Sequence, residues 1–261
     1  YRLPADVAQP QDATQHYLNQ LESLLQQHHS TIAAMIIEPV VQGAAGMIMQ
    51  PSRYLTGVRQ LTKQYDVLLI ADEVAVGFGR TGAMFACDHE NIQPDLMCLA
   101  KGLTGGYITM AATLATTEIW NAFLGDPART FYHGHTYGGN PLAAAAAIAN
   151  LDIFKSEQTM VNVRERTKQL ADLLKPLTDH HHVGDVRQRG LIVAIELVAD
   201  KDNKTSFENS GASGSAVCKA ALEPGVWLRP LRDTIVIMPP PSISASEITK
   251  IVTVVEPDIC G

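Results

Sequence analysis

Two polar residues of this chain stand directly after apolar runs, where open α/β sheets place reactive groups. Asp72 follows the run 67–71, and Lys101 follows the run 96–100. If both runs are neighbouring buried strands, their carboxyl ends meet at one edge of the sheet. A lysine amine can hold an aldehyde as a Schiff base, and a carboxylate can keep a pyridine nitrogen protonated. The pair predicts pyridoxal 5'-phosphate (PLP) as cofactor, although either residue alone also fits a solvated lysine or a helix N-terminal acid.

The surroundings of Asp72 bear on the same chemistry. A carboxylate beside a cation keeps its charge because each charge stabilises the other, and a protonated pyridinium supplies such a cation. Val74 lies two positions further along, on the same side of the chain, where a β-branched side chain can pack under a planar ring. Plain core packing explains Val74 equally well.

Two arginines are candidates for binding a carboxylate, because a guanidinium does so through paired hydrogen bonds. Arg80 lies in the glycine-dense run 77–82, which lacks both the Gly-Lys-Ser/Thr ending of a P-loop and the dinucleotide-binding spacing. Arg229 follows the apolar segment 226–228. A surface salt bridge is an equally good interpretation of Arg229.

The run 133–141 offers several donors to an anion: the Thr136 hydroxyl, backbone amides beside glycines, and a helix start at Asn140. His133 and His135 also suggest a metal, but no third ligand has matching spacing. The histidines 180–182 raise the same alternative, and their place between a proline and a glycine favours a solvated turn.

The elements that must position these residues alternate along the chain. Apolar residues at helical spacing predict helices, and short continuous apolar runs predict buried strands. The expected helices span 13–27, 54–65, 140–153, 156–177 and 244–255, and the expected strands span 32–37, 67–71, 96–100, 108–115, 191–197, 226–228 and 235–238. Strands separated by helices predict an α/β fold with a mostly parallel sheet covered on both faces.

The composition of the sequence changes near residue 153: the predicted helices after this point are more charged, and the predicted strands are shorter. This predicts a large domain over residues 1–153 and a smaller α+β domain over 154–261. The polar, Gly/Ser-rich segment 201–215 predicts a surface loop. The Ala-rich segment 143–149 is typical of a buried helix.

Composition narrows the function classes. The 261 residues are 46% hydrophobic and carry a net charge of -7, with acids and bases interspersed, so no basic face for nucleic acid is visible. No apolar stretch approaches the roughly 20 residues of a membrane helix. The four cysteines form no CxxC pair, which favours a reducing, cytoplasmic compartment.

Four ordered motifs make the sequence recognisable, at 37–43, 71–82, 94–102 and 133–141. Together they resemble the class-III PLP-dependent aminotransferases of fold type I, from about residue 30 to the end. The implied fold is a mostly parallel sheet sandwiched by helices, with a smaller C-terminal α+β domain. Ala75 and the segments 101–106, 227–230 and 237–240 look most like the branch of the family that serves biotin biosynthesis.

The resemblance implies a role for each matching residue. Lys101 would form the Schiff base with PLP and then act as general acid and base. Asp72 would pair with the ring nitrogen, and Val74 would pack on the ring. The remaining roles are PLP phosphate contacts across a homodimer for Thr136 with His135, and substrate binding for Gly134, Arg229, Arg80 and Glu38.

The resemblance also implies the reaction. An amino group would pass from a donor to PLP and then to the ketone of 8-amino-7-oxononanoate, giving 7,8-diaminononanoate. The donor is S-adenosylmethionine in the commonest version of the step and lysine in a variant. His135 stands where the enzymes that use S-adenosylmethionine often carry proline, so the identity of the donor stays open.

Part of the family pattern is absent from this sequence. The family's N-terminal part, with its Gly/Ser phosphate cup and ring-stacking aromatic residue, has no counterpart here, and Tyr1 to Pro10 looks like the middle of a loop. Two alternatives therefore stay open: another class-III enzyme, such as an ω-amino-acid transaminase or an aminomutase, and a shortened, non-enzymatic module that holds no cofactor. Ala75 and the segment 227–240 speak against the first.

Overall fold

The computed structural model describes residues 13–203 and 205–260. Its α-helices are α1 (Ala13–His28), α2 (Tyr54–Gln64), α3 (Thr117–Ala122), α4 (Pro141–Ser156), α5 (Thr159–Leu174), α6 (Ala212–Ala220) and α7 (Ala245–Cys260). Its strands are β1 (Ala34–Ile37), β2 (Val41–Gln42), β3 (Ile48–Met49), β4 (Leu68–Asp72), β5 (Leu96–Leu99), β6 (Ala112–Ala115), β7 (Val183–Arg189), β8 (Ile192–Leu197), β9 (Arg229–Leu231) and β10 (Thr234–Ile237). Its 3-10 helices are η1 (His29–Thr31), η2 (Ala86–Glu90), η3 (Lys101–Leu103), η4 (Pro127–Arg129) and η5 (Lys175–Asp179). None of the described helices is long and apolar enough to cross a membrane. The loop expected at Tyr1 to Pro10 lies outside the described residues.

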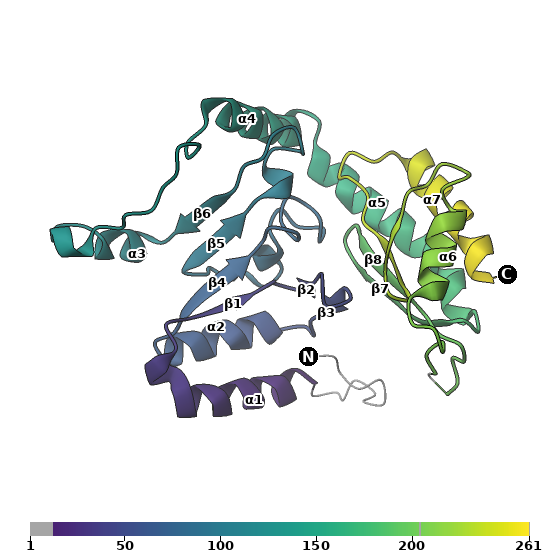
Figure 1. Ribbon diagram of the computed structural model, residues 1–261, viewed down its shortest axis with the longest axis horizontal. Helices are drawn as coiled ribbons and strands as arrows, with labels where there is room; N and C mark the ends of the chain where they lie inside the picture. Colours follow the sequence, from purple (N-terminus) through teal and green to yellow (C-terminus); the bar gives the residue numbers. More distant parts are fainter. Residues whose placement is uncertain (1–12, 204, 261) are drawn as a thin grey trace.

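The first sheet has the strand order β1-β4-β5-β6 (Figure 1). β1, β4 and β5 run parallel, and β6 pairs antiparallel with β5. The register sets Ile37 beside Ala71 and Asp72 beside Cys98. The three strands expected from the first apolar runs are confirmed, and so is the mostly parallel α/β sheet.

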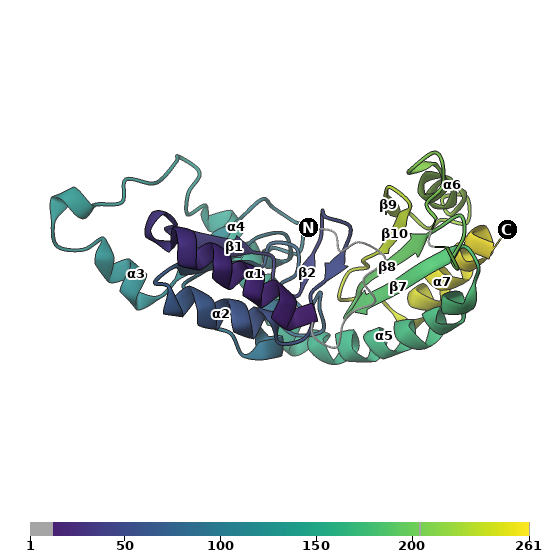
Figure 2. The ribbon, with the colours of Figure 1, turned by 90° about the horizontal axis from the view of Figure 1, so that it is seen from below.

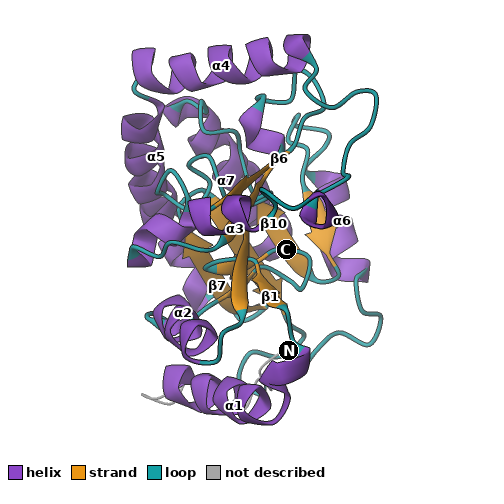
Figure 3. Cartoon of the chain, turned by 90° about the vertical axis from the view of Figure 1, so that its left-hand side faces the viewer, coloured by secondary structure: helices purple, strands orange, loops and turns teal. Residues whose placement is uncertain are grey.

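Helices cover both faces of this sheet. α1 and α2 lie on one face, where Leu18 and Leu55 pack against Leu69. α4 lies on the opposite side (Figure 3), where Ala147 packs with Leu99. Apolar residues recur every three to four positions along α1 and α2, so each helix turns one stripe toward the strands.

α4 begins where the sequence predicts, because the Oδ1 of Asn140 accepts a hydrogen bond of 2.9 Å from the backbone N–H of Leu142. The expectation of a buried helix over 143–149 is only partly correct. Ala143 and Ala147 are buried, whereas Ile148 is 61% exposed. The stripe that carries Ala143 and Ala147 is therefore covered, whereas the side that carries Ile148 is open.

The second sheet, with the order β7-β8-β10-β9, is entirely antiparallel. It lies beside the first sheet, with α5 and α7 against it (Figure 2). Its core includes Leu170, Ile195, Ile235 and Ile248. The predicted domain boundary after residue 153 falls within α4, and the division into two domains stays a prediction.

Three expectations for this region are wrong. The sequence analysis predicts no strand where the structure contains β7, because the charged residues of that segment hide its alternation of apolar and polar positions. The strand expected at 226–228 lies three residues later as β9, at the sheet edge, where Pro230 removes no ladder hydrogen bond. The loop expected at 201–215 ends early, because α6 begins at Ala212; Asp233 accepts hydrogen bonds from the backbone N–H groups of Gly211 (2.7 Å) and Gly214 (3.2 Å) at its start.

Long-range hydrogen bonds join the two sheet regions. The backbone N–H of Leu191 donates to the carbonyl of Arg80 at 2.9 Å. The Arg187 guanidinium donates to the carbonyls of Gly46 (3.2 Å) and Met47 (3.4 Å) in the β2–β3 hairpin. The glycine-dense loop after β4 is therefore held against the second sheet.

Candidate active site at the carboxyl edge of the parallel strands

The structure places Asp72 and Lys101 at the same edge of the first sheet. Asp72 is the last residue of β4 and pairs in register with Cys98 of β5. Lys101 begins η3, two residues after β5 ends. Because β4 and β5 are parallel, both side chains emerge from the carboxyl edge. The Asp72 Oδ1 accepts a hydrogen bond of 3.1 Å from the N–H of Val74, which orients the carboxylate.

The turn that carries Lys101 is tightly packed. Lys101 has a φ of 43°, a left-handed conformation that is uncommon for residues other than glycine. A Cβ on Gly102 would lie 2.8 Å from the Cβ of Phe78, so the turn approaches the glycine-dense loop as closely as only glycine allows. Asn150 of α4 donates to the carbonyls of Gly102 (2.8 Å) and Leu103 (3.2 Å). The lysine is exposed, but Phe78 and Asn150 hold the backbone that follows it.

Glu73, beside Asp72, is the residue that the sequence analysis missed. It is completely buried, and its two carboxylate oxygens accept hydrogen bonds from the backbone N–H groups of Ala86 (2.9 Å) and Cys87 (2.8 Å). Burial raises the pKa of the Glu73 carboxyl, and these hydrogen bonds offset only part of that rise. Burial also raises the pKa of the Cys87 thiol. Glu73 thus fastens η2 under the end of β4.

Arg80 reaches from the glycine-dense loop to the second sheet. Its Nη1 donates to the carbonyl of Met238 at 3.3 Å and also to the carbonyl of Pro239. Burial lowers the pKa of the Arg80 guanidinium. A role for Arg80 in substrate binding stays a prediction; its observed contacts hold the segment after β10.

Glu38 follows β1 at the same carboxyl edge. Both of its carboxylate oxygens lie 3.2–3.3 Å from the N–H of Gly43, and its carbonyl accepts a 2.8 Å hydrogen bond from the side chain of Gln50. The carboxylate therefore closes the turn before β2. Val74 is partly buried beside Asp72.

The remaining predicted residues lie elsewhere. Gly134, His135 and Thr136 are exposed in the connection between α3 and α4, where the Nδ1 of His135 accepts a 3.1 Å hydrogen bond from the N–H of Tyr137. Arg229 opens β9 in the second sheet and is exposed. Within the described part of the chain, no hydrogen bond or ion pair links these four residues to Asp72 or Lys101.

The chain thus brings five of the predicted residues to one sheet edge or to the loop that follows it: Glu38, Asp72, Val74, Arg80 and Lys101. It keeps Gly134, His135, Thr136 and Arg229 apart from them. Over residues 13–203 and 205–260, no group of three metal-binding side chains is found.

Comparison with known proteins gives consistent matches. The sequence profile of the family described as aminotransferase class-III matches residues 1–257, which extends the resemblance to the first residue. A relative from Nitratidesulfovibrio vulgaris is 49% identical over 97% of this chain and 47% of its own length. One from Geobacter sulfurreducens is 49% identical over 99% of this chain and 58% of its own. Both are named adenosylmethionine-8-amino-7-oxononanoate aminotransferase.

Solved structures agree. A crystal structure of the like-named protein from Methanocaldococcus jannaschii has a TM-score of 0.89 at 44% identity, covering 93% of this chain and 57% of that one. A PLP-bound amine transaminase from an uncultivated Pseudomonas species has a TM-score of 0.93 at 38% identity, covering 100% and 60%. The predicted PLP-dependent transferase fold is confirmed. The chain spans about half the length of the curated relatives it matches.

Proposed function

Because this chain belongs to the aminotransferase class-III family, we propose that it supplies the lysine and the ring-nitrogen partner of a PLP-dependent transamination site. The observation that carries the proposal is the parallel register of β4 and β5, which sets Asp72 beside Cys98 and brings Lys101 to the same edge. The residues present suit the cofactor. Asp72 is oriented by the N–H of Val74, and Lys101 is exposed and makes no ion pair among the described residues.

Each residue has a distinct task in the proposed reaction. Bound PLP supplies an aldehyde for the Schiff base and a ring that takes up electrons. Asp72 would keep the ring nitrogen protonated by placing a negative charge beside it. The Lys101 Nζ would hold the aldehyde and, as a free amine, would move a proton between the two carbons that flank the transferred nitrogen. Val74 packs against the ring.

The proposed substrates come from the relatives. Those at 45–49% identity are named for 8-amino-7-oxononanoate and adenosylmethionine, so the proposed reaction is the amination of 8-amino-7-oxononanoate in biotin biosynthesis. S-adenosylmethionine is the proposed donor, with lysine as the alternative. In this proposal Arg229 binds the substrate carboxylate, Arg80 helps to shape the substrate site, and Gly134 and Glu38 line it.

The proposed assembly is a homodimer in which Thr136 and His135 contact the PLP phosphate of the neighbouring subunit. What supports this is the exposure of both residues in a segment rich in exposed apolar side chains. These are Tyr107, Trp120, Phe131, Tyr132, Tyr137 and Leu142. Large exposed apolar patches mark interaction surfaces. A cytoplasmic location is proposed as well, supported by the free thiols of Cys87, Cys98 and Cys218.

Absorbance tests the cofactor assignment directly. PLP added to the purified chain should give a band at about 420 nm from the Schiff base, through the cofactor's own chemistry. Lys101→Ala should remove the band, whereas Lys155→Ala, which changes a lysine in the last turn of α4, should keep it. No band in the unchanged chain at saturating PLP would favour the non-enzymatic alternative.

A second candidate, an ω-amino-acid transaminase, rests on structural neighbours that are transaminases of other kinds at 33–38% identity. Single-turnover conversion of the PLP form to the pyridoxamine form separates the two. S-adenosylmethionine, lysine and 4-aminobutyrate are supplied in turn. Conversion by 4-aminobutyrate alone would overturn the biotin-pathway assignment while leaving the PLP assignment standing.

A further inference from the structure

A cavity lies at the junction of the two sheet regions, and none of its lining residues is among those assigned to PLP or substrate. It has a volume of about 400 Å³. The glycine-dense loop, η2, α5 and the end of β7 all contribute to its wall. Its lining residues are Thr81, Gly82, His89, Arg164, Thr167, Gln188, Arg189 and Gly190.

The fixed charges of this cavity are positive. Arg164 and Arg189 both line it, and neither forms an ion pair within the described ranges. The acids that adjoin the lining residues in the sequence each accept hydrogen bonds from other groups. Glu90 accepts hydrogen bonds of 2.7 Å from the N–H groups of Arg53 and Thr56, and from the Thr56 hydroxyl. In addition, Glu165 pairs with Arg166 at 3.1 Å, and Asp88 accepts a 2.9 Å hydrogen bond from the N–H of Phe85.

Two of the lining residues also carry a polar atom that has no hydrogen-bond partner. The Nε of Arg189 and the Oγ1 of Thr167 are both buried without a hydrogen bond. A buried donor left unpaired costs about 1–3 kcal/mol, so the burial of these atoms lowers the stability of the fold. Both atoms are shielded from solvent and so lie behind the cavity surface, which leaves the two guanidinium charges as the feature that recommends the cavity as a ligand site.

An occupant that accepts hydrogen bonds suits this wall, because three of its carbonyl groups already accept hydrogen bonds from side chains of the wall. The side chain of Gln188 donates to the carbonyls of Thr167 (2.9 Å) and Gly190 (3.0 Å). The Nε2 of His89 lies 3.0 Å from the carbonyl of Thr81. The two guanidinium groups add positive charge and hydrogen-bond donors, which is the chemistry that recognises phosphate.

We propose that this cavity is a binding site for a phosphate group, held by Arg189 and Arg164. Its volume leaves room for a small organic phosphate ester as well as for the free ion. Because Thr81 belongs to the loop after β4 whereas Arg189 ends β7, an occupant ties the two sheet regions together. The site does not depend on the proposed transamination.

Isothermal titration calorimetry with inorganic phosphate tests the proposal, on the PLP-saturated chain at constant ionic strength. We expect saturable binding of one phosphate per chain. Arg189→Gln and Arg164→Gln should each weaken it about 10-fold or more, since each removes a charge-assisted hydrogen bond. Arg164 is exposed, so its variant should fold normally, as thermal unfolding would verify. Arg129→Gln, the same charge change at an exposed site in η4, should bind phosphate like the unchanged chain.

Two results would overturn the proposal. One is the absence of saturable binding in the unchanged chain. The other is binding that is lost with Thr136→Ala but kept with Arg189→Gln, which would place the ion in the PLP phosphate site. A parallel titration with glycerol phosphate identifies the source of the group: tighter binding than inorganic phosphate indicates an organic ester, and weaker binding indicates the free ion.

Discussion

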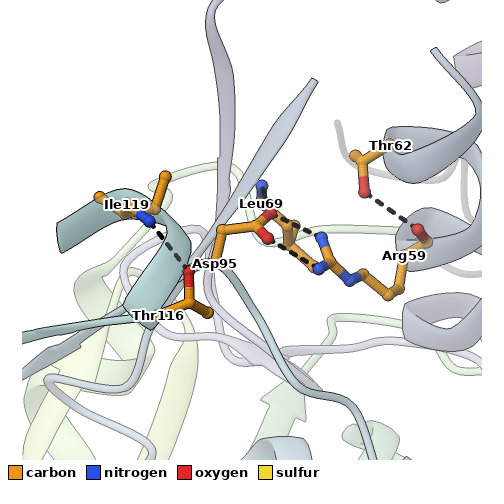
Figure 4. A network of polar contacts seen from close by, with 6 residues as sticks. All are labelled: Arg59, Thr62, Leu69, Asp95, Thr116 and Ile119. Atoms are coloured by element: carbon orange, nitrogen blue, oxygen red, sulfur yellow. Dashed lines mark hydrogen bonds and ion pairs between the residues drawn. The ribbon is translucent and has the colours of Figure 1, made fainter. Parts of the chain in front are cut away.

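Arg59 and Asp95 form a bidentate ion pair (Figure 4). The pair lies at the amino edge of the parallel strands, opposite the edge that carries the candidate site. Nη1 lies 2.6 Å from Oδ2, and Nη2 lies 2.8 Å from Oδ1. The same Oδ2 accepts a 2.7 Å hydrogen bond from the N–H of Leu69, and the Asp95 N–H donates to the Leu69 carbonyl at 2.9 Å. The pair therefore fastens α2 to the start of β4 and β5, whose other ends carry Asp72 and Lys101.

Asp95→Asn should lower the free energy of unfolding by about 3 kcal/mol, because it leaves the largely buried Arg59 without a counter-charge. The Arg59 guanidinium holds the pKa of the Asp95 carboxyl below its usual range. A lowered folded-state pKa contributes stability above the unfolded pKa, and that stability is lost as pH falls through the folded pKa. Urea unfolding at neutral and acidic pH should show the unchanged chain losing more stability on acidification than the variant.

Asp185→Asn is the matched control for this change. Asp185 pairs with Arg187 at 2.7 Å, but its side chain is 52% exposed. Exposed pairs contribute about 0–1 kcal/mol. Equal losses in the two variants would show that burial of the Arg59–Asp95 pair adds nothing to the fold.

Glu73→Gln should destabilise the chain by about 2 kcal/mol at low pH, because an amide has one acceptor for the two N–H groups of Ala86 and Cys87. The folded-state pKa of Glu73 is raised by burial. Its contribution is therefore complete below the unfolded pKa and is lost as pH rises through the folded pKa. The difference between the two chains should shrink as pH rises.

Urea unfolding from about pH 4 to about pH 8 measures this difference. The titration of Asp95 affects both chains alike and cancels from the comparison. A difference that stays constant over the range would mean that Glu73 has the same pKa in the folded and unfolded chain.

The parts of the site that sequence predicts are those that local pattern specifies. Asp72 and Lys101 each end an apolar run, and a parallel arrangement of two such runs brings both to one edge without further information. The start of α4 is equally local, because Asn140 caps a helix whose first residue is proline. In each case the signal and its structural cause lie within a few residues.

What sequence misses depends on distant partners. Glu73 is buried because η2 folds back over it and supplies two N–H groups. Neither the type nor the spacing of Asp72 and Glu73 indicates this burial. Arg80 meets the carbonyl of Met238, 158 positions away. Arg187 makes the segment of β7 look like a polar loop in the sequence, although its charge is paired with Glu196 at 2.6 Å in the structure.

Arg80 and Arg229 should respond differently to replacement by lysine, because their surroundings differ. Arg80→Lys removes the partly buried guanidinium that donates to Met238 and Pro239, and should lower the free energy of unfolding by about 1–3 kcal/mol. Arg229 is exposed, so Arg229→Lys should leave stability nearly unchanged. Under the proposed function, Arg229→Lys should raise KM for 8-amino-7-oxononanoate, because lysine lacks the planar fork. Unfolding and steady-state kinetics on both variants decide the matter; a normal KM with Arg229→Lys would remove that residue from the substrate site.

Gly190→Ala tests the contact between the second sheet and the glycine-dense loop. Gly190 has a φ of 62°, and a Cβ there would lie 2.2 Å from the carbonyl carbon of Thr81 and 2.3 Å from the backbone nitrogen of Gly82. Gly139 has a φ of 69°, and a Cβ at this position would have no other heavy atom within 4 Å. Both alanine variants should lose about 1 kcal/mol from left-handed backbone strain, but only Gly190→Ala adds an overlap with rigid backbone, for a total of about 3 kcal/mol or more. Denaturant unfolding of the two variants measures the difference, and equal losses would show that the Thr81–Gly82 segment moves aside at no cost, so that the junction between the two sheet regions is loose.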